Sequence, residues 1–136
     1  MILLDTNILI DLFGTDDHPG AQWSRDAYDR LSDRGEFACN LIVLAELAAE
    51  GAPADVVLEQ CDIFRVRIVD LDVDSAFAAG RAHRRYRLRG GTRQAVLADF
   101  LIAGHAEAVG ASLMTRDRRI AGYFPDLNLI TPETHP

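Results

Sequence analysis

Short apolar runs alternate with helical segments along the chain, and this alternation restricts the possible folds more than any other feature. The first run, residues 1–4, has no polar residue in it, which is typical of a strand buried on both faces. Strands that alternate with helices over short loops favour a parallel α/β sheet covered by helices on both faces. The expected strands span residues 1–4, 36–40, 64–71, 112–114 and 127–130.

Glycine, asparagine and proline mark the expected helix boundaries. Gly14 and Gly110 each follow a run of apolar residues at helical spacing and are suited to end it. Asn40 is placed to cap the helix after the second strand. The polar segment 16–20 contains Pro19, and we expect it to form a loop. The expected helices span residues 8–13, 21–34, 41–50, 54–62, 72–88 and 96–109.

Size and composition describe one folded domain with an acidic surface. A chain of 136 residues, 49% of them hydrophobic, can bury a core, so we expect residues 1–136 to form a single domain. Its formal net charge of -7 counts against binding nucleic acid through a simple basic surface. A site of several carboxylates would resolve this difficulty, because bound cations reverse the local charge.

The sequence favours a reducing compartment without membrane association. The apolar N-terminal run is interrupted by Asp5 and has no basic leader, and no stretch approaches the roughly 20 apolar residues that span a bilayer. Cys39 and Cys61 are too few for a disulfide framework and lie in apolar segments, so we expect two buried thiols. A cytoplasmic location follows as the expectation.

Four acidic residues lie beside or within apolar segments. Asp5 and Asp117 follow the first and fourth expected strands, so both should lie at the carboxyl edge of the sheet, where such folds bind ligands. Glu46 has only apolar neighbours on its helix, and Asp99 precedes apolar residues by three and four positions. A carboxylate buried in this way is costly unless it is paired or bound to a cation.

A divalent cation would explain why these acids gather. Carboxylates brought together without Arg or Lys repel one another, and Mg²⁺ or Mn²⁺, which prefer carboxylate oxygens, relieve that repulsion. Such an ion can activate water and stabilise charge on a phosphodiester. The sequence therefore predicts a metal site that acts on a phosphate ester.

Each acid also has an ordinary structural interpretation. Asp5 could be a turn residue or helix cap, and Asp99 could be favoured by the dipole of its helix. The helical glutamate could be solvated, and Asp117 could pair with a neighbouring arginine, Arg116 or Arg118. We favour the metal site because all four interpretations would otherwise have to hold at once.

Four short segments carry these acids in order along the chain: ILLDTNILID at 2–11, LAEL at 44–47, ADFLIAGHA at 98–106 and LMTRD at 113–117. Together they resemble the successive motifs of PIN-domain ribonucleases, in particular the VapC-type toxins of type II toxin–antitoxin systems. Order, spacing and length all agree over essentially the whole chain. The resemblance implies a five-stranded parallel sheet flanked by helices, and Mg²⁺- or Mn²⁺-dependent endoribonuclease activity on RNA phosphodiester bonds.

The resemblance also implies roles for individual residues and partners. It makes Asp5 and Asp99 the principal metal ligands. Two further acids, Glu46 and Asp117, would complete the catalytic cluster directly or through water. The side chains of Asn7 and Thr115 would orient the carboxylates or the substrate by hydrogen bonds. Members of this family typically form homodimers and are inhibited by a cognate antitoxin, so we expect both partners here.

Basic and aromatic residues suggest further contacts. His105 is expected to be packed or hydrogen-bonded rather than to act as a base. Trp23, Tyr28 and Phe64 are candidates for a dimer surface. A run of arginines could bind RNA phosphates, although a solvated helix face or an antitoxin contact explains it equally well. The run comprises Arg81, Arg84, Arg85, Arg87, Arg89 and Arg93.

Two other functions are compatible with an α/β chain that opens on a strand and an aspartate. A phosphatase of the haloacid dehalogenase type needs a second aspartate two residues after the first, where this chain has Asn7, and a later lysine, which this chain lacks. A PIN-fold module that binds RNA or protein without activity would be expected to lose its acids. All four motif acids are present, which favours the enzyme.

Overall fold

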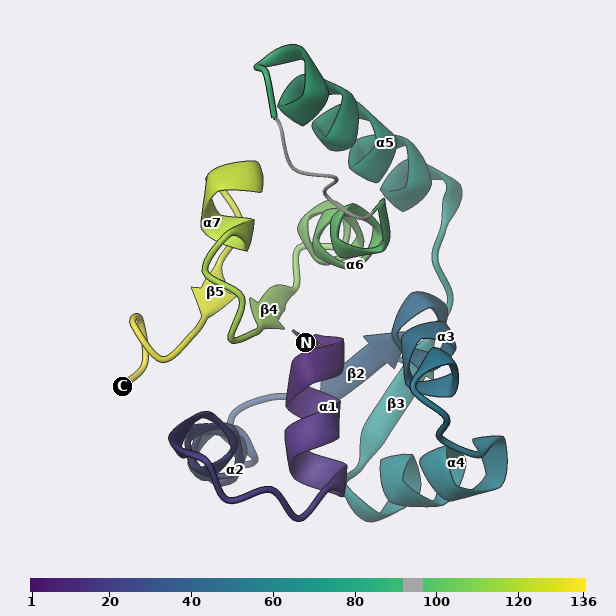
Figure 1. Ribbon diagram of the computed structural model, residues 1–136, viewed down its shortest axis with the longest axis vertical. Helices are drawn as coiled ribbons and strands as arrows, with labels where there is room; N and C mark the ends of the chain where they lie inside the picture. Colours follow the sequence, from purple (N-terminus) through teal and green to yellow (C-terminus); the bar gives the residue numbers. More distant parts are fainter. Residues whose placement is uncertain (92–96) are drawn as a thin grey trace.

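The computed structural model describes residues 1–91 and 97–136. A five-stranded sheet of order β3-β2-β1-β4-β5 forms its centre, and every neighbouring pair of strands is parallel (Figure 1). This confirms the α/β class and the parallel five-stranded sheet. The strands are β1 (Ile2–Leu4), β2 (Phe37–Asn40), β3 (Val66–Val69), β4 (Ser112–Met114) and β5 (Leu129–Ile130).

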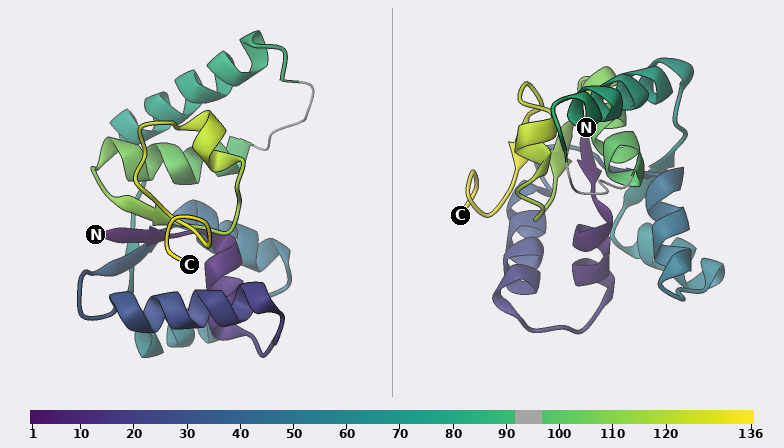
Figure 2. Two further views of the ribbon diagram at one scale, coloured as in Figure 1. Left: turned by 90° about the vertical axis from the view of Figure 1, so that its left-hand side faces the viewer. Right: turned by 45° about the horizontal axis from the view of Figure 1, so that its top comes forward.

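Helices cover both faces of the sheet, as expected (Figure 2). They are α1 (Thr6–Phe13), α2 (Pro19–Leu31), α3 (Leu41–Ala49), α4 (Ala54–Ile63), α5 (Val73–Leu88), α6 (Leu97–Ala108) and α7 (Ile120–Tyr123). One face carries α6 with α5 packed outside it, and the other carries α1, α2 and α4. Helix α3 starts where β2 ends and contacts both α1 and α6, so it joins the two layers beside the carboxyl edge of the sheet.

The central strand is buried on both faces, as its unbroken apolar sequence predicts. Leu3 and Leu4 are almost completely excluded from solvent, and the register pairs Leu4 with Met114 of β4. At the carboxyl end of β1, the backbone N–H of Asp5 donates to the carbonyl oxygen of Met114 at 3.0 Å. The buried core therefore extends to the residue where the expected site begins.

Most elements differ from the prediction by one to three residues at an end, and two differences have a clear physical reason. Helix α2 begins at Pro19 rather than at residue 21, because a proline at the first helical position loses no hydrogen bond. His18 caps this helix, with its Nδ1 accepting from the backbone N–H of Ala21 at 3.1 Å. The one-turn helix α7 was not predicted, since four residues are too few to show helical periodicity.

Buried thiols and half-buried aromatic residues complete the packing. Cys39 and Cys61 are free and buried, and burial raises the pKa of the Cys39 thiol to about 12. The Tyr28 hydroxyl donates to the carbonyl oxygen of Phe64 at 2.8 Å, and the Trp23 indole N–H donates to that of His135 at 2.8 Å. The three aromatic residues considered for a dimer surface therefore make contacts inside the chain. Within residues 1–91 and 97–136, no helix is long and apolar enough to cross a membrane.

Candidate active site

Asp5 lies at the carboxyl end of β1 and caps helix α1. Its Oδ1 accepts a hydrogen bond from the backbone N–H of Thr6 at 2.8 Å, which satisfies one of the free donors at the start of the helix. The aspartate is buried, with 8% of its surface exposed. Its carboxylate is therefore held at the edge of the sheet where ligands are expected to bind.

Two polar side chains fix the second oxygen of this carboxylate. The Thr115 hydroxyl donates to Asp5 Oδ2 at 2.7 Å, and Asn7 Nδ2 donates to the same oxygen at 3.2 Å. Asn7 also donates to Thr115 Oγ1 at 3.3 Å. Thr115 directly follows β4, so residues from α1 and the β4 end converge on Asp5. These are the two side chains expected to orient the acids.

The electrostatic environment of Asp5 is dominated by burial and by other acids. Its pKa is raised from the ordinary 3.8 to about 6, mainly by burial, and the hydrogen bonds from Thr115 and from the Thr6 backbone oppose that rise. The charges of Asp99 and Glu46 contribute smaller parts of the rise. The fold therefore brings three of the four predicted acids close enough to act on one another.

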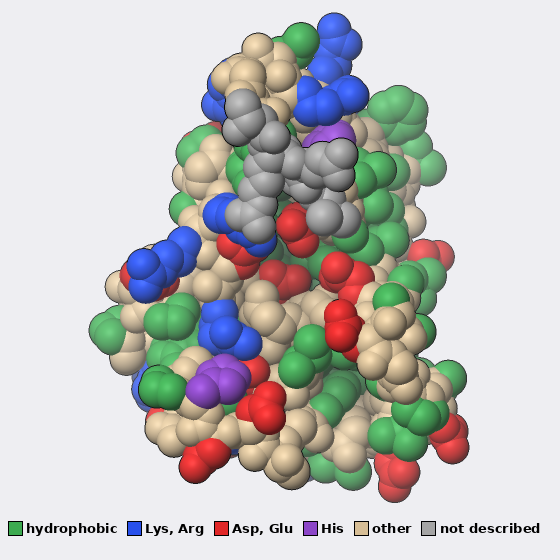
Figure 3. Space-filling model, viewed as in Figure 1, with side chains coloured by type: hydrophobic (Ala, Val, Ile, Leu, Met, Phe, Trp, Pro, Cys, Tyr) green, Lys and Arg blue, Asp and Glu red, His purple; other side chains and the backbone are tan. Residues whose placement is uncertain are grey.

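Glu46 and Asp99 reach this region from α3 and α6. Glu46 is half-buried, and its Oε1 accepts a hydrogen bond from the Thr6 hydroxyl. Thr6 thus links the two acids, because its backbone N–H binds Asp5. Asp99 lies in the first turn of α6 and is also half-buried. Figure 3 shows acidic side chains gathered near the centre of this face, where α1, α3 and α6 meet.

Asp117 has a different environment from the other three acids, because Arg119 holds it in a bidentate ion pair. Arg119 Nε donates to Asp117 Oδ1 at 2.8 Å and Nη2 donates to Oδ2 at 2.6 Å. The pair raises the pKa of Arg119 above its ordinary value, and Asp99 adds to that effect. The premise that the acids gather without an arginine is therefore wrong.

The alternative partners considered for Asp117 bind elsewhere. Arg118 extends into solvent and pairs with Glu133 at 2.7 Å. Arg116 forms a bidentate pair with Asp11, through Nε to Oδ2 at 2.7 Å and Nη2 to Oδ1 at 3.0 Å. From the sequence, the expected partner of Asp117 was Arg116 or Arg118, whereas the structure pairs Asp117 with Arg119.

The buried pair of Asp11 and Arg116 was not predicted from the sequence. Asp11 is only 1% exposed, and the Ser24 hydroxyl also donates to its Oδ2 at 2.6 Å. The backbone N–H of Arg116 donates to Asn7 Oδ1 at 3.1 Å, so the pair ties α1 to the segment after β4. The available signal was the position of Asp11 three residues after Ile8, on the buried side of an amphipathic helix.

The described members of the arginine run lie apart from Asp5, Glu46 and Asp99. Its helical members are exposed on the C-terminal half of α5, which lies across α6 from α1 (Figure 1). Arg93 lies outside the described residues. The exposed members on this half of the helix and just after it are Arg81, Arg84, Arg85, Arg87 and Arg89.

His105 is packed and hydrogen-bonded, as expected. It is 3% exposed, and its Nδ1 lies 3.3 Å from Asn40 Nδ2. Burial lowers its pKa, which favours the neutral imidazole. The same Asn40 side chain caps α3 by accepting from the backbone N–H of Val43 at 3.1 Å.

The donor set fits a hard divalent cation in chemistry and charge. Asp5, Glu46 and Asp99 supply carboxylate oxygens, which Mg²⁺ and Mn²⁺ prefer. The pKa of Asp5 is raised mainly by burial and in smaller part by the charges of Asp99 and Glu46, and a bound cation would offset both effects. In the part of the chain that the structure describes, no three His, Cys, Asp or Glu side chains are already arranged around one ion position. The side chains of Asp5, Glu46 and Asp99 would therefore have to move in order to bind one ion together.

Comparisons with known proteins agree with this architecture. The structure is similar to that of VapBC2 from Rickettsia felis bound to a promoter DNA fragment, with 28% sequence identity, a TM-score of 0.73, and coverage of 96% of this chain and 98% of that chain. It is also similar to DNA-bound VapBC from Salmonella typhimurium, with 24% identity, a TM-score of 0.70 and 96% coverage of both chains. VapBC-1 from nontypeable Haemophilus influenzae has 23% identity and a TM-score of 0.71, with coverage of 96% and 98%.

A search of curated proteins finds no match. The sequence model of one family does match, and it covers residues 2–123, from the first strand to the end of α7. This range includes all four acids and the two side chains that donate to Asp5. The chain therefore belongs to the PIN domain family.

Proposed function

We propose that residues 1–136 form one PIN domain that acts as the toxin of a toxin–antitoxin pair, cutting cytoplasmic RNA as a Mg²⁺- or Mn²⁺-dependent endoribonuclease. The observation that carries this proposal is the environment of Asp5. A buried carboxylate at the carboxyl edge of the sheet lies in the field of Asp99 and Glu46, and its pKa is raised to about 6. Several carboxylates this close together carry negative charge that a bound divalent cation would neutralise.

Each residue has a defined task in this proposal. Asp5 and Asp99 hold the ion, and Glu46 completes the cluster directly or through water. Asn7 and Thr115 fix the Asp5 carboxylate through their hydrogen bonds to its Oδ2. When bound, the ion supplies activation of water and stabilisation of charge on the phosphodiester. Asp117 belongs to the same cluster through the bond from its backbone N–H to Thr115 Oγ1 at 3.0 Å.

The comparisons support an antitoxin as one proposed partner. The Rickettsia felis chain with 28% identity belongs to a VapBC2 complex. By analogy, we propose that a cognate antitoxin protein binds this chain. The resemblance of its motifs to those of VapC-type toxins is the basis for a second proposal, that the chain forms a homodimer. The exposed arginines of α5 remain a proposed RNA contact, with the antitoxin as the alternative ligand of that surface.

RNA cleavage in defined metal conditions tests the proposal. Wild-type protein should cut a labelled single-stranded RNA with Mg²⁺ or Mn²⁺ and should lose that activity in excess chelator. Asp5→Asn and Asp99→Asn should reduce the rate by about 100-fold or more, since even the partners of metal ligands are worth 10–100-fold. Asp74→Asn, which neutralises an exposed acid on α5, is the matched control and should leave the rate unchanged.

Two assays distinguish the other functions. A binding module without activity should give no Mn²⁺ binding isotherm by calorimetry. A phosphatase should hydrolyse a generic phosphate monoester, and its activity should exceed RNA cleavage. Normal RNA cleavage by both Asp5→Asn and Asp99→Asn would show that the proposed site is wrong.

A further inference from the structure

The Asp117–Arg119 pair uses both oxygens of a carboxylate that would otherwise be counted as a metal ligand. Asp117 Oδ1 accepts hydrogen bonds from Arg119 Nε at 2.8 Å and from the backbone N–H of Arg119 at 3.0 Å. Asp117 Oδ2 accepts a third from Arg119 Nη2 at 2.6 Å. A paired fork of this kind is among the stronger and more directional contacts between side chains. An ion that used Asp117 directly would have to compete with three donors from one residue.

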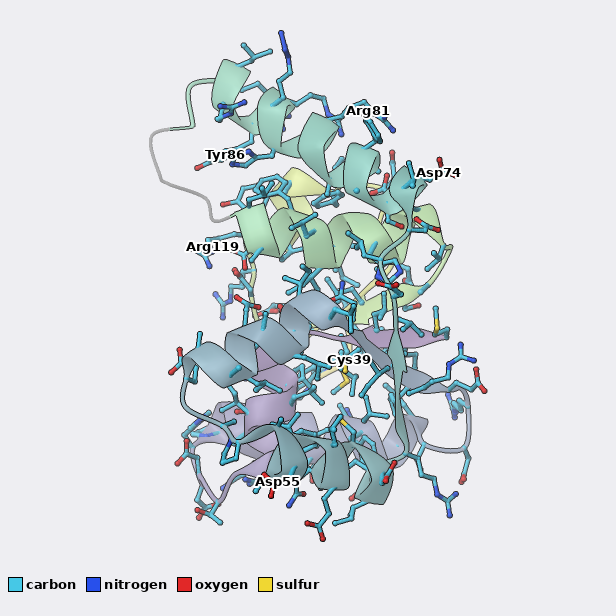
Figure 4. All side chains as sticks on the ribbon, turned by 90° about the vertical axis from the view of Figure 1, so that its right-hand side faces the viewer. Cys39, Asp55, Asp74, Arg81, Tyr86 and Arg119 are labelled. Carbon is cyan, nitrogen blue, oxygen red and sulfur yellow. The ribbon has the colours of Figure 1, made fainter. Side chains whose placement is uncertain are left out.

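Arg119 also lies beside the acids that the proposed ion would use. Figure 4 shows it next to the N-terminal end of α6, the end that carries Asp99 in its first turn. The charge of Asp99 contributes to the raised pKa of the guanidinium, which places the two groups within electrostatic reach. By contrast, Arg81 extends from α5 away from the sheet.

The guanidinium is anchored on one side and accessible on the other. The side chain of Arg119 is 39% exposed, whereas that of Asp117 is 16% exposed. The segment that carries both residues is tied to the site, because the backbone N–H of Asp117 donates to Thr115 Oγ1 and Thr115 donates to Asp5 Oδ2. Arg119 is thus held at a fixed place relative to Asp5, with part of its surface open to a ligand.

An acidic pocket needs such a group if its substrate is a polyanion. The acids repel a phosphodiester, and a bound divalent cation offsets only part of their charge. A guanidinium matches two phosphate oxygens with two parallel N–H groups, which a lysine cannot do. The Asp117–Arg119 pair has no net charge. Arg119 would therefore bind a phosphate through N–H donors held in a fixed orientation, and not by making the whole pocket more positive.

We propose that Arg119 is a substrate-binding residue that contacts a phosphate of the RNA, and that Asp117 is the positioning residue that anchors Arg119 rather than a direct metal ligand. This inference rests on the proposed ribonuclease function and refines it. Of the four motif acids, three (Asp5, Glu46 and Asp99) would bind the ion, and Asp117 would position Arg119.

Metal affinity tests the assignment of Asp117. Mn²⁺ binding is measured by calorimetry for the wild type, Asp117→Asn, Asp5→Asn and Arg119→Gln. We expect Asp5→Asn to weaken Mn²⁺ binding by about tenfold or more, and Asp117→Asn and Arg119→Gln to change it by less than about threefold. If Asp117→Asn weakens binding as much as Asp5→Asn does, Asp117 is a ligand and the inference is wrong.

Steady-state cleavage kinetics test the assignment of Arg119. Arg119→Gln should raise KM for RNA by about tenfold, the worth of one charge-assisted contact, with a smaller change in kcat. Arg119→Lys should restore part of this loss, because it keeps the charge but not the fork. The matched control is Arg118→Gln, since this neighbour pairs with Glu133 and has an 82% exposed side chain, and its KM should equal that of the wild type.

The outcomes separate the inference from the function on which it rests. Circular dichroism first establishes that each variant is folded. Wild-type KM in both Arg119 variants overturns the inference while leaving the ribonuclease intact. Equal losses in Arg118→Gln and Arg119→Gln also overturn it, because they indicate a general charge effect. Wild-type protein that neither binds Mn²⁺ nor cuts RNA contradicts the proposed function, and the inference then falls with it.

Discussion

Asp5 and Asp11 are both buried aspartates of the same segment, and neutralising them should change stability in opposite directions. Asp5 is 8% exposed and Asp11 is 1% exposed. The charges that raise the pKa of Asp5 belong to two acids, whereas Asp11 is held by the bidentate contact from Arg116. We therefore expect Asp5→Asn to stabilise the metal-free protein at neutral pH and Asp11→Asn to destabilise it.

The expected gain for Asp5→Asn follows from its pKa. A rise from 3.8 to about 6 means that the folded protein binds the Asp5 proton more tightly than the unfolded chain does. The stability that this proton supplies is present below about pH 4 and is lost as the pH rises through 6. The loss is about 3 kcal/mol at neutral pH. Asparagine avoids that loss but weakens the bond from Thr115, so we expect a net gain of about 1–3 kcal/mol.

The expected loss for Asp11→Asn follows from its ion pair. Breaking a buried pair costs about 3–5 kcal/mol, because the remaining charge keeps no partner. The side chain of Arg116 is 28% exposed, so water replaces part of the lost contact. We therefore expect a loss of about 2–4 kcal/mol.

Urea unfolding in excess chelator measures both effects. At pH 7.5 the midpoint of Asp5→Asn should lie above that of the wild type, and the midpoint of Asp11→Asn below it. At pH 4.5 the wild-type Asp5 is largely protonated in the folded protein, so the advantage of Asp5→Asn should shrink by about 2 kcal/mol. An Asp5→Asn protein that is less stable than the wild type at pH 7.5, or an advantage independent of pH, would refute this reasoning.

Three further changes test the packing and the site. Gly104→Ala should lower the melting temperature, with a loss of about 1–3 kcal/mol, because its Cβ would lie 2.9 Å from Ala79 Cα in α5. Its matched control, Gly80→Ala, faces open space and should be neutral or stabilising. Asn40→Ala removes the cap of α3 and the hydrogen bond to buried His105, and it should cost about 2–3 kcal/mol in urea unfolding. Glu46→Gln should weaken Mn²⁺ binding in calorimetry by about tenfold without lowering stability; unchanged affinity would exclude Glu46 from the site.

The sheet and the position of Asp5 could be predicted because they depend on local sequence and on a general rule of topology. An unbroken apolar run specified a strand buried on both faces, and the aspartate after it had to lie at the carboxyl edge. The start of α2 at Pro19 could not be predicted in the same way, because a polar segment with a proline suits either a loop or a first helical turn.

The arginine contacts of the site were beyond sequence reasoning for a different reason. Arg116, Arg118 and Arg119 lie within four positions of the chain, and all three form ion pairs with different acids. The backbone path after β4 decides which guanidinium reaches Asp117, and periodicity does not describe such a path. Asp11 was predictable in principle, since its spacing from Ile8 placed it on the buried side of α1.

A crystal of the protein grown with Mn²⁺ and measured at the manganese absorption edge tests the central claim most directly. We expect an anomalous difference peak within coordination distance of the carboxylates of Asp5 and Asp99. The same peak should be absent from crystals of Asp5→Asn grown under identical conditions. A wild-type map with no peak at these carboxylates, or with a peak bound only by other residues, would contradict the account.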